Sequence, residues 1–484
     1  MSVPTDVGAG VPATAEELAP EAAADEAAAA WPMLATAAGA VFVLWGLRIG
    51  LRQLHDNSFL THLATGRIIV DKGVIPRTDP YSFTATGHPW TVASWFASLL
   101  YGLTDRVGGL AGIRVLDGVL AAGMAALIWR LARPAGLVAR IAITAFAVGL
   151  GGGSWLERPL LFGLVAMAII LVLAEGPGDP RWAIPVMWLW VNTHGSFPLG
   201  FVAVALMAAG AWLDGERQLR ELRLLGWMTV GTLVGGINPL GPSLLLFPLE
   251  LLHKSHSFRT IQEWNPLRLN TIWAFIFVAQ VVVATLLLAR RRSWRAALPL
   301  AVFTVFAFTS VRNMAPASLV FVPGMAAAVA GLGSIDGLRR SRSAMAGIGG
   351  CVIAGCLLGV VSLAQPDAKL DAYPETAVTW LQQQGLLEDH LVAPDYVGNY
   401  LEARYGPRRM VFMDDRVDMY PASVVDDAID LLHGTSDWDA ILGRYHAGVV
   451  LWERDGKLTK LMRHAPDWRI AYRDKDWVVF LPRA

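Results

Sequence analysis

The sequence predicts an α-helical membrane protein of about eleven transmembrane helices, followed by a small α/β domain. Of the 484 residues, 54% are hydrophobic and only 17% are charged, and the mean hydropathy is +0.45. This composition is typical of polytopic membrane proteins and rare among soluble domains. The formal net charge is zero, so the overall charge gives no sign of a nucleic-acid partner.

Hydrophobic runs of about 20 residues, the length that crosses a bilayer, recur up to residue 364. We expect spans at 32–51, 108–130, 137–154, 159–175, 181–195, 196–214, 222–237, 271–290, 295–311, 313–332 and 345–364. Residues 1–31 hold six acids and no Lys or Arg, which predicts a disordered acidic N-terminal tail. The chain then divides into this tail, a transmembrane domain at 32–364 with an outer loop at 52–90, and a domain at 365–484.

Arginine clusters indicate which side of the membrane each loop occupies. They fall on alternate loops, as the positive-inside rule predicts for cytoplasmic loops, at 130–140, 217–223, 290–295 and 339–342. The first span alone suggests the reverse, because Arg48 and Arg52 follow it. Four loops outweigh one flank, so we expect a cytoplasmic N-terminus and an extracytoplasmic C-terminal domain. Segment 91–107, short and apolar on one face, fits an interfacial helix on the outer leaflet.

Residues 365–484 are charged and contain no run of spanning length. Short apolar runs predict strands at 410–413, 448–452 and 477–481. Helical spacing predicts helices at 376–384 and 423–432. We therefore expect a small α/β domain outside the membrane.

Ionisable and amide side chains collect at the predicted outer ends of the spans. Such groups are costly near a membrane unless water, partners or a ligand receive them, and segments broken by Pro and Gly are tolerated where they line a cavity. The sequence thus predicts an outward-facing polar cavity. The candidate residues are Asp56, His62, Arg67, Asp79, Glu157, Arg158, Asn192, His194, Glu263 and Arg312.

Several of these residues have simpler structural interpretations. Asp56 is well placed to cap a helix over Asn57–Lys72 that Gly73 would end. His62 lies on an apolar stripe of that helix, where a packing histidine is equally expected. Asp79 precedes a proline and suits a turn.

The remaining candidates also have structural alternatives. Glu157 and Arg158 could form a structural ion pair. Asn192 and His194 could hydrogen-bond between helices within the membrane. Arg312 could extend to lipid headgroups. No spacing of His, Cys or acidic residues forms a recognisable metal-binding motif.

Four stretches resemble the GT-C-type membrane glycosyltransferases, and in particular a bacterial group of GT-C-like proteins. They are DNSFLTHLATGR at 56–67, IPRTDPYSF at 75–83, NTHG at 192–195 and Glu263-Trp264. The likeness also includes the outer segment 396–418 and covers most of the chain.

The resemblance implies a bacterial cytoplasmic-membrane enzyme that moves a sugar from a polyprenyl-phosphate donor to a cell-envelope glycan, lipid or protein at the outer leaflet. Asp56 matches the acidic residue of the first outer loop that serves such enzymes as base or as acceptor-binding group. Many members carry two adjacent acids there. In this chain His55 and Asn57 flank Asp56, so the second acid is missing or is supplied by Asp79. A divalent cation therefore stays open as a cofactor.

The chemistry of such a transfer suits the remaining candidates. A leaving phosphate needs cationic donors, and arginine offers it a bidentate fork. Arg158 and Arg312 are the first choices, and Arg67 and Arg114 are further ones. The pocket would be shaped by His62, Asn192, His194 and Glu263. Two other functions fit the same pattern: a transporter or flippase of an amphipathic or lipid-linked substrate, and a non-catalytic envelope scaffold with the GT-C shape.

Overall fold

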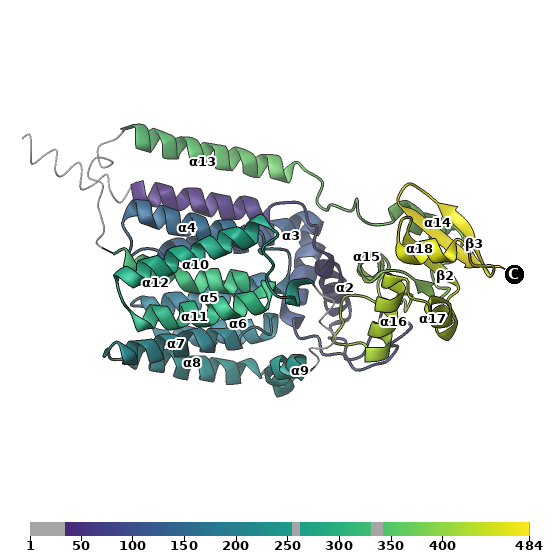
Figure 1. Ribbon diagram of the computed structural model, residues 1–484, viewed down its shortest axis with the longest axis horizontal. Helices are drawn as coiled ribbons and strands as arrows, with labels where there is room; N and C mark the ends of the chain where they lie inside the picture. Colours follow the sequence, from purple (N-terminus) through teal and green to yellow (C-terminus); the bar gives the residue numbers. More distant parts are fainter. Residues whose placement is uncertain (1–33, 254–261, 331–341, 484) are drawn as a thin grey trace, which may run out of the picture.

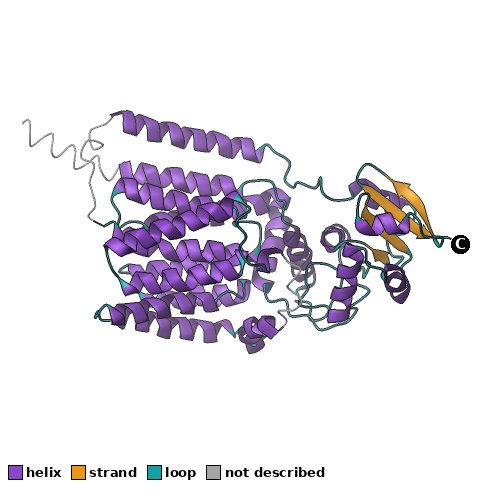
Figure 2. Cartoon of the chain, viewed as in Figure 1, coloured by secondary structure: helices purple, strands orange, loops and turns teal. Residues whose placement is uncertain are grey.

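The computed structural model describes residues 34–253, 262–330 and 342–483. A bundle of roughly parallel helices forms one part, and a small α/β domain lies beyond one end of it (Figures 1 and 2). Helix α2 (Asn57–Lys72) lies between the two parts (Figure 1). The acidic tail predicted at 1–31 falls outside the described residues.

Each of the eleven hydrophobic runs contains a helix within the described residues. Their bounds are Leu34–Gly50, α3 Trp95–Leu131, α4 Leu137–Gly152, α5 Pro159–Glu175, α6 Ala183–Thr193, α7 Pro198–Leu213, α8 Leu219–Gly235, α10 Ile272–Arg290, α11 Trp294–Thr309, α12 Met314–Ala328 and α13 Arg342–Leu363. In this described part, only α3 and α10 are long and apolar enough to cross a bilayer by length and composition alone. The helices are therefore present, but the count of eleven transmembrane spans is not confirmed.

Helix α3 contains a break that separates the segment predicted to be interfacial from the span after it. Gly109 has φ 60° and ψ −156°, so the helical path is interrupted there. A positive φ is accessible to glycine without steric cost. Residues 95–108 thus form a helical segment distinct from 110–131.

The arginine-rich loops at 130–140, 217–223 and 290–295 meet at the end of the bundle far from the C-terminal domain (Figure 1). Arg295 of α11 pairs with Glu175 of α5 at 2.7 Å and with Glu221 of α8 at 2.9 Å. Asp214, which follows α7, accepts the backbone N–H of Trp294 at 2.8 Å. These three loops, which the sequence assigns to the cytoplasm, therefore share one end; residues 331–341, with most of the fourth cluster, fall outside the described residues.

Helices α2 and α3 are in close contact because glycines face each other. A Cβ atom added at Gly66 would lie 2.0 Å from the carbonyl oxygen of Ser98, and one at Gly102 would lie 2.4 Å from the backbone of Gly66. Only residues without a side chain allow two helix backbones to approach so closely. This contact fixes α2 against the bundle.

The C-terminal domain has a four-stranded sheet in the order β1-β2-β4-β3. The strands are β1 Leu391–Val392, β2 Val449–Glu453, β3 Trp468–Arg473 and β4 Trp477–Pro482; β1 and β2 are parallel and the other pairs antiparallel. The helices are α14 Glu375–Gln383, α15 Asp395–Tyr405, α16 Ala422–His433, α17 Trp438–Arg444 and α18 Lys457–Met462.

One predicted strand is wrong. Segment 410–413 does not join the sheet; Val411 instead bridges Ser82 of the outer loop. The N–H of Phe83 donates to the carbonyl of Val411 at 3.0 Å, and the N–H of Val411 donates to the carbonyl of Tyr81 at 3.2 Å. The β-forming run pairs with a distant segment, so it attaches the C-terminal domain to the outer loop.

Candidate active site

A cavity of about 1020 Å³ lies between the bundle and the C-terminal domain. One wall comes from α2, the start of α5, the segment after α6, and two short 3-10 helices, η4 (Gln262–Trp264) and η5 (Val311–Asn313). The opposite wall comes from 393–395, 412–418 and α16. Its volume suits a ligand larger than a single sugar.

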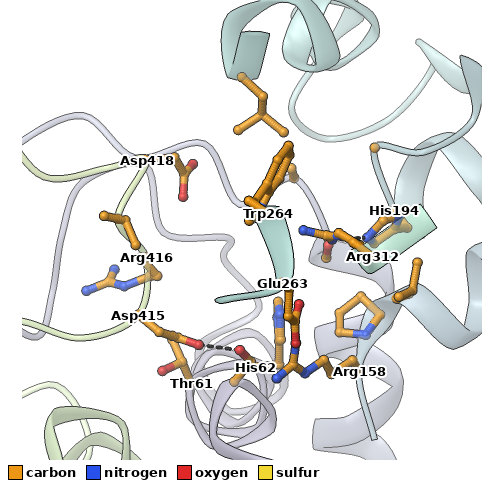
Figure 3. Close-up of a pocket in the computed structure, with 18 of the residues that line it drawn as sticks. Thr61, His62, Arg158, His194, Glu263, Trp264, Arg312, Asp415, Arg416 and Asp418 are labelled. Carbon is orange, nitrogen blue, oxygen red and sulfur yellow. Dashed lines mark hydrogen bonds and ion pairs between the residues drawn. The ribbon is translucent and has the colours of Figure 1, made fainter. Parts of the chain in front are cut away.

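Three acids and one arginine define the floor of the cavity. Asp56 caps α2 by accepting the N–H of Phe59 at 3.3 Å, and its other oxygen accepts Nε of Arg158 at 2.5 Å. Arg158 also pairs with Glu263, as Figure 3 shows. Glu157 is buried and accepts the backbone N–H of Asp56 at 2.5 Å. Arg158 is thus neutralised by two carboxylates.

Burial is the main cause that raises the pKa of Asp56, and the charge of Arg158 opposes the rise. Arg158 and Glu263 line the cavity, whereas Asp56 and Glu157 lie behind them. The helix-cap role expected for Asp56 and its pairing with an arginine are therefore both present.

A second cationic group lies beside this cluster. Nη2 of Arg312 is 3.0 Å from Nε2 of His194, and the guanidinium of Arg312 is 5.2 Å from the ring centroid of Trp264. Figure 3 shows the three side chains together at one side of the cavity. Within the described residues, Arg312 makes no ion pair with a carboxylate. It therefore keeps its charge available to a ligand.

His62 projects from α2 into the cavity and contacts Ser98 of α3, with Nδ1 to Oγ at 3.1 Å. Burial lowers the pKa of His62 to about 4, and the charges of Arg158 and Arg416 act in the same direction. The ring is therefore neutral at physiological pH and serves as a hydrogen-bonding group.

The opposite wall carries acidic residues of the C-terminal domain, namely Asp395, Asp415 and Asp418. Asp415 and Asp418 lie across the cavity from Arg312 and His194 (Figure 3). Asp415 accepts the hydroxyl of Ser58 on α2. Arg312 therefore faces carboxylates of the C-terminal domain across the cavity.

Asp79 does not line the cavity but belongs to a buried ion cluster whose arginine, Arg416, does. It accepts the N–H of Ser82 at 2.9 Å and pairs with Nη2 of Arg416 at 2.7 Å. Arg416 also binds Asp414 at 2.5 Å and lies 4.2 Å from the ring centroid of Trp90. The cluster connects the outer loop to the C-terminal domain, which is a structural role of the kind expected for a turn former.

Arg67 and Asn192 also lie away from the cavity. Arg67 pairs with Asp105 of α3 and donates to the carbonyl of Ala403 in α15, both at 2.7 Å. The buried Asn192 accepts Nε1 of Trp95 at 2.8 Å and donates to the carbonyl of Gly235 at 3.1 Å. Asn192 thus connects three helices, as the helix-packing alternative predicts.

The structure divides the ten candidates evenly. The cavity is lined by His62, Arg158, His194, Glu263 and Arg312, whereas the supporting shell contains Asp56, Arg67, Asp79, Glu157 and Asn192. Sequence reasoning assigned no role to Ser58, Asp395, Asp415 or Asp418. Asp415 and Asp418 lie within segment 396–418, whose resemblance was the only signal for them, and Asp395 lies just before it. Nothing in the sequence shows which outer residues meet α2.

Among the described residues, no group of three or more His, Cys, Asp or Glu is placed to hold a metal ion. Asp56 and Glu263 approach each other, but the guanidinium of Arg158 lies between them. The carboxylate oxygens that could bind a metal ion at this point therefore already bind a cationic side chain.

The fold is that of GT-C-type membrane glycosyltransferases, which confirms the resemblance at the level of structure. The oligosaccharyltransferase of Archaeoglobus fulgidus in its apo form matches with a TM-score of 0.55 and 12% identity, over 85% of this chain and 69% of that chain. The arabinofuranosyltransferase AftD from Mycobacteria matches with a TM-score of 0.52 and 12% identity, over 94% of this chain and 40% of that chain. The sequence matches no protein-family profile and no curated protein sequence.

Proposed function

We propose that this protein is a membrane glycosyltransferase that moves a sugar from a polyprenyl phosphate to a hydroxyl group of a cell-envelope acceptor at the outer leaflet. The observation that carries the proposal is the arginine Arg312, held by His194 and Trp264 inside the cavity without a carboxylate partner among the described residues. A half-buried arginine of this kind is suited to a phosphate, which can accept two parallel N–H bonds from it.

The surroundings of Arg312 suit a lipid phosphate better than a free one. The bundle residues that line the cavity include apolar side chains, among them Leu199, Val202, Phe247 and Phe306. They come from α7, α9 (Phe247–His253) and α11. An isoprenoid chain would bury its apolar surface against them while its phosphate reaches Arg312.

The acceptor would enter from the C-terminal domain, whose acidic wall faces the cationic one. Arg158 is already paired, so its part in phosphate binding would be to orient Glu263 and support the local charge. Asp56 and Glu157 would hold Arg158 and the start of α2 in place. This arrangement supports single displacement with inversion at the anomeric carbon.

The test is turnover of defined donors by the purified full-length protein in lipid nanodiscs. Synthetic farnesyl phosphates of mannose, glucose, galactose and arabinose would be incubated with an envelope extract, and mass spectrometry would measure released farnesyl phosphate. We expect release from at least one donor and its loss in Arg312→Gln. Donor binding without release would contradict a transferase and favour a transporter or scaffold.

A further inference from the structure

One carboxylate on the cavity wall has an oxygen left for a substrate. Asp415 is partly buried, and its Oδ2 accepts the hydroxyl hydrogen of Ser58. Within the described residues no hydrogen bond or ion pair engages its Oδ1. Asp415 lies on the wall opposite Arg312 and His194 (Figure 3).

The position of Asp415 is fixed from both parts of the molecule. Its backbone N–H donates to Oδ1 of Asn399 at 3.1 Å, and Nδ2 of Asn399 donates to the carbonyl of Asn57 at 3.2 Å. Asn399 is buried in α15, and Asn57 begins α2. The carboxylate is therefore held at a defined place relative to α2, although it belongs to the C-terminal domain.

The other acids near the floor lack this freedom. Asp56 uses one oxygen for the N–H of Phe59 and the other for Arg158, and it does not line the cavity. Glu263 lines the cavity but pairs with Arg158. A carboxylate engaged by a guanidinium is a weaker proton acceptor, because the positive charge favours its ionised form.

The proton affinity of Asp415 suits acid–base work at neutral pH. Burial raises the pKa of Asp415 to about 7; the hydrogen bond from Ser58 opposes the rise, and the charge of Asp414 adds to it. A general base is most effective when its pKa lies near the working pH.

We propose that Asp415 is the general base of the transfer, with Ser58 as its positioning residue; this inference rests on the glycosyltransferase function proposed above. Oδ1 of Asp415 takes the proton of the acceptor hydroxyl while the hydroxyl oxygen forms the bond to the anomeric carbon. The bond from that carbon to the phosphate oxygen breaks, and its electron pair stays on the lipid phosphate, which Arg312 binds. The protonated Asp415 then returns its proton to water.

This assignment differs from the one expected for Asp56 in the wall of the cavity that accepts the proton: the base lies on the wall of the C-terminal domain. In this arrangement the donor phosphate and the base lie on opposite walls, as displacement with inversion requires. Asp56 acts through Arg158 and is itself a positioning residue. The C-terminal domain thereby becomes part of the catalytic site as well as a place for the acceptor to bind.

The experiment uses the full-length protein and the farnesyl phosphate sugar that the wild type consumes fastest. Donor binding is measured by calorimetry without acceptor, and initial rates are measured from pH 5 to pH 9, a range chosen to bracket the pKa near 7. Asp415→Asn should keep donor affinity and unfolding temperature and lose turnover by about 10²–10⁴-fold, the usual contribution of a general base. The matched control is Asp426→Asn, on the exposed face of α16.

The pH profile supplies a second readout that holds even if Asp415→Asn fails to fold. The wild-type rate should rise tenfold per pH unit below about pH 7 and then level off, because the base must be unprotonated. Ser58→Ala removes the bond that lowers the pKa, so its profile should move to higher pH.

The outcomes separate this inference from the proposed function. If Asp415→Asn turns over donor at the wild-type rate, or if Ser58→Ala leaves the pH profile unchanged, Asp415 is not the base. The proposed glycosyltransferase function would still stand. Absence of release from every donor by the folded wild type would overturn both. If Asp56→Asn loses turnover while Asp415→Asn stays fully active, Asp56 is the general base.

Discussion

Arg312 and His194 are joined by a hydrogen bond of 3.0 Å between Nη2 and Nε2. A guanidinium can only donate, so Nε2 accepts. Nδ1 lies 2.8 Å from Oγ of Ser196 and 3.2 Å from its backbone nitrogen, so Ser196 holds the other side of the ring. His194 is therefore a neutral acceptor that orients the arginine.

The first prediction concerns this pair. Arg312→Gln should lower turnover by about 10²-fold or more, the range seen when one donor to a developing oxyanion is removed. Arg312→Lys should recover only part of the loss, because an ammonium lacks the planar fork. His194→Ala should weaken donor affinity less than Arg312→Gln does. The measurements are donor affinity and release rate.

Arg217→Gln provides the control for that series, since Arg217 is exposed in the loop after α7 at the opposite end of the bundle. It should behave as the wild type does. An Arg312→Gln protein that binds and consumes donor at the wild-type rate would show that the phosphate binds elsewhere.

The second prediction concerns the contact of α2 with α3. Gly66→Ala should destabilise the protein by about 1–3 kcal/mol, the usual cost of forcing extra atoms into a packed contact, because its Cβ would meet the carbonyl oxygen of Ser98. Gly123→Ala, in the partner helix α3, is the matched control, because a Cβ atom there meets nothing within 4 Å. Thermal unfolding in detergent would compare the two; equal unfolding temperatures would contradict the close contact.

The sequence predicted the helices well because hydrophobic runs reveal them directly. The predicted run at 159–175 and the observed helix Pro159–Glu175 coincide, since a proline and a glycine mark its two ends. The number of spans is harder to obtain, because helices such as α6 are short and their burial depends on neighbours. The strand predicted at 410–413 failed for a similar reason: a run with strand propensity does not specify its partner.

The site was only half visible in the sequence. Residue type identified Arg312 and His194, because polar groups at the ends of apolar segments are conspicuous. Nothing in the local sequence could show that Asp79 pairs with Arg416, 337 positions away, or that Asp415 meets Ser58. Those contacts depend on how the C-terminal domain sits on the outer loop, and tertiary packing alone decides it.

The third prediction concerns the buried ion cluster. Arg416→Met should destabilise the protein by about 3–5 kcal/mol, because it leaves Asp79 and Asp414 as uncompensated buried charges. Arg408→Met is the control, since Arg408 pairs with Glu388 where both side chains are exposed, and it should change the unfolding temperature little. Chemical unfolding followed by tryptophan fluorescence would measure both. A stable Arg416→Met protein would show that the cluster does not hold the domain.

The fourth prediction concerns divalent cations. Asp56 and Glu263 are both bound to Arg158, so their oxygens are not available as a pair of hard ligands for Mg²⁺ or Mn²⁺. We expect EDTA to leave the release of farnesyl phosphate unchanged. Activity that EDTA abolishes and Mn²⁺ restores would contradict this. Arg158→Met would then be informative, because it removes the cation that separates the two carboxylates.

The last prediction is a pH dependence of stability that arises from His62. Its pKa is about 4 in the folded protein, against an ordinary value of 6.5 that applies to the unfolded chain. Between these two pH values the unfolded chain binds more protons, so the stability falls as the pH is lowered. The full difference corresponds to at most about 3 kcal/mol, and water in the cavity reduces it. Asp415 acts in the opposite direction, because its pKa is raised to about 7.

Comparing the unfolding temperature of the wild type and His62→Gln at pH values from 6.5 down to 4 isolates the histidine, since Asp415 is present in both. The variant should lose less stability than the wild type, and parallel curves would show that His62 is solvated and free to take up a proton.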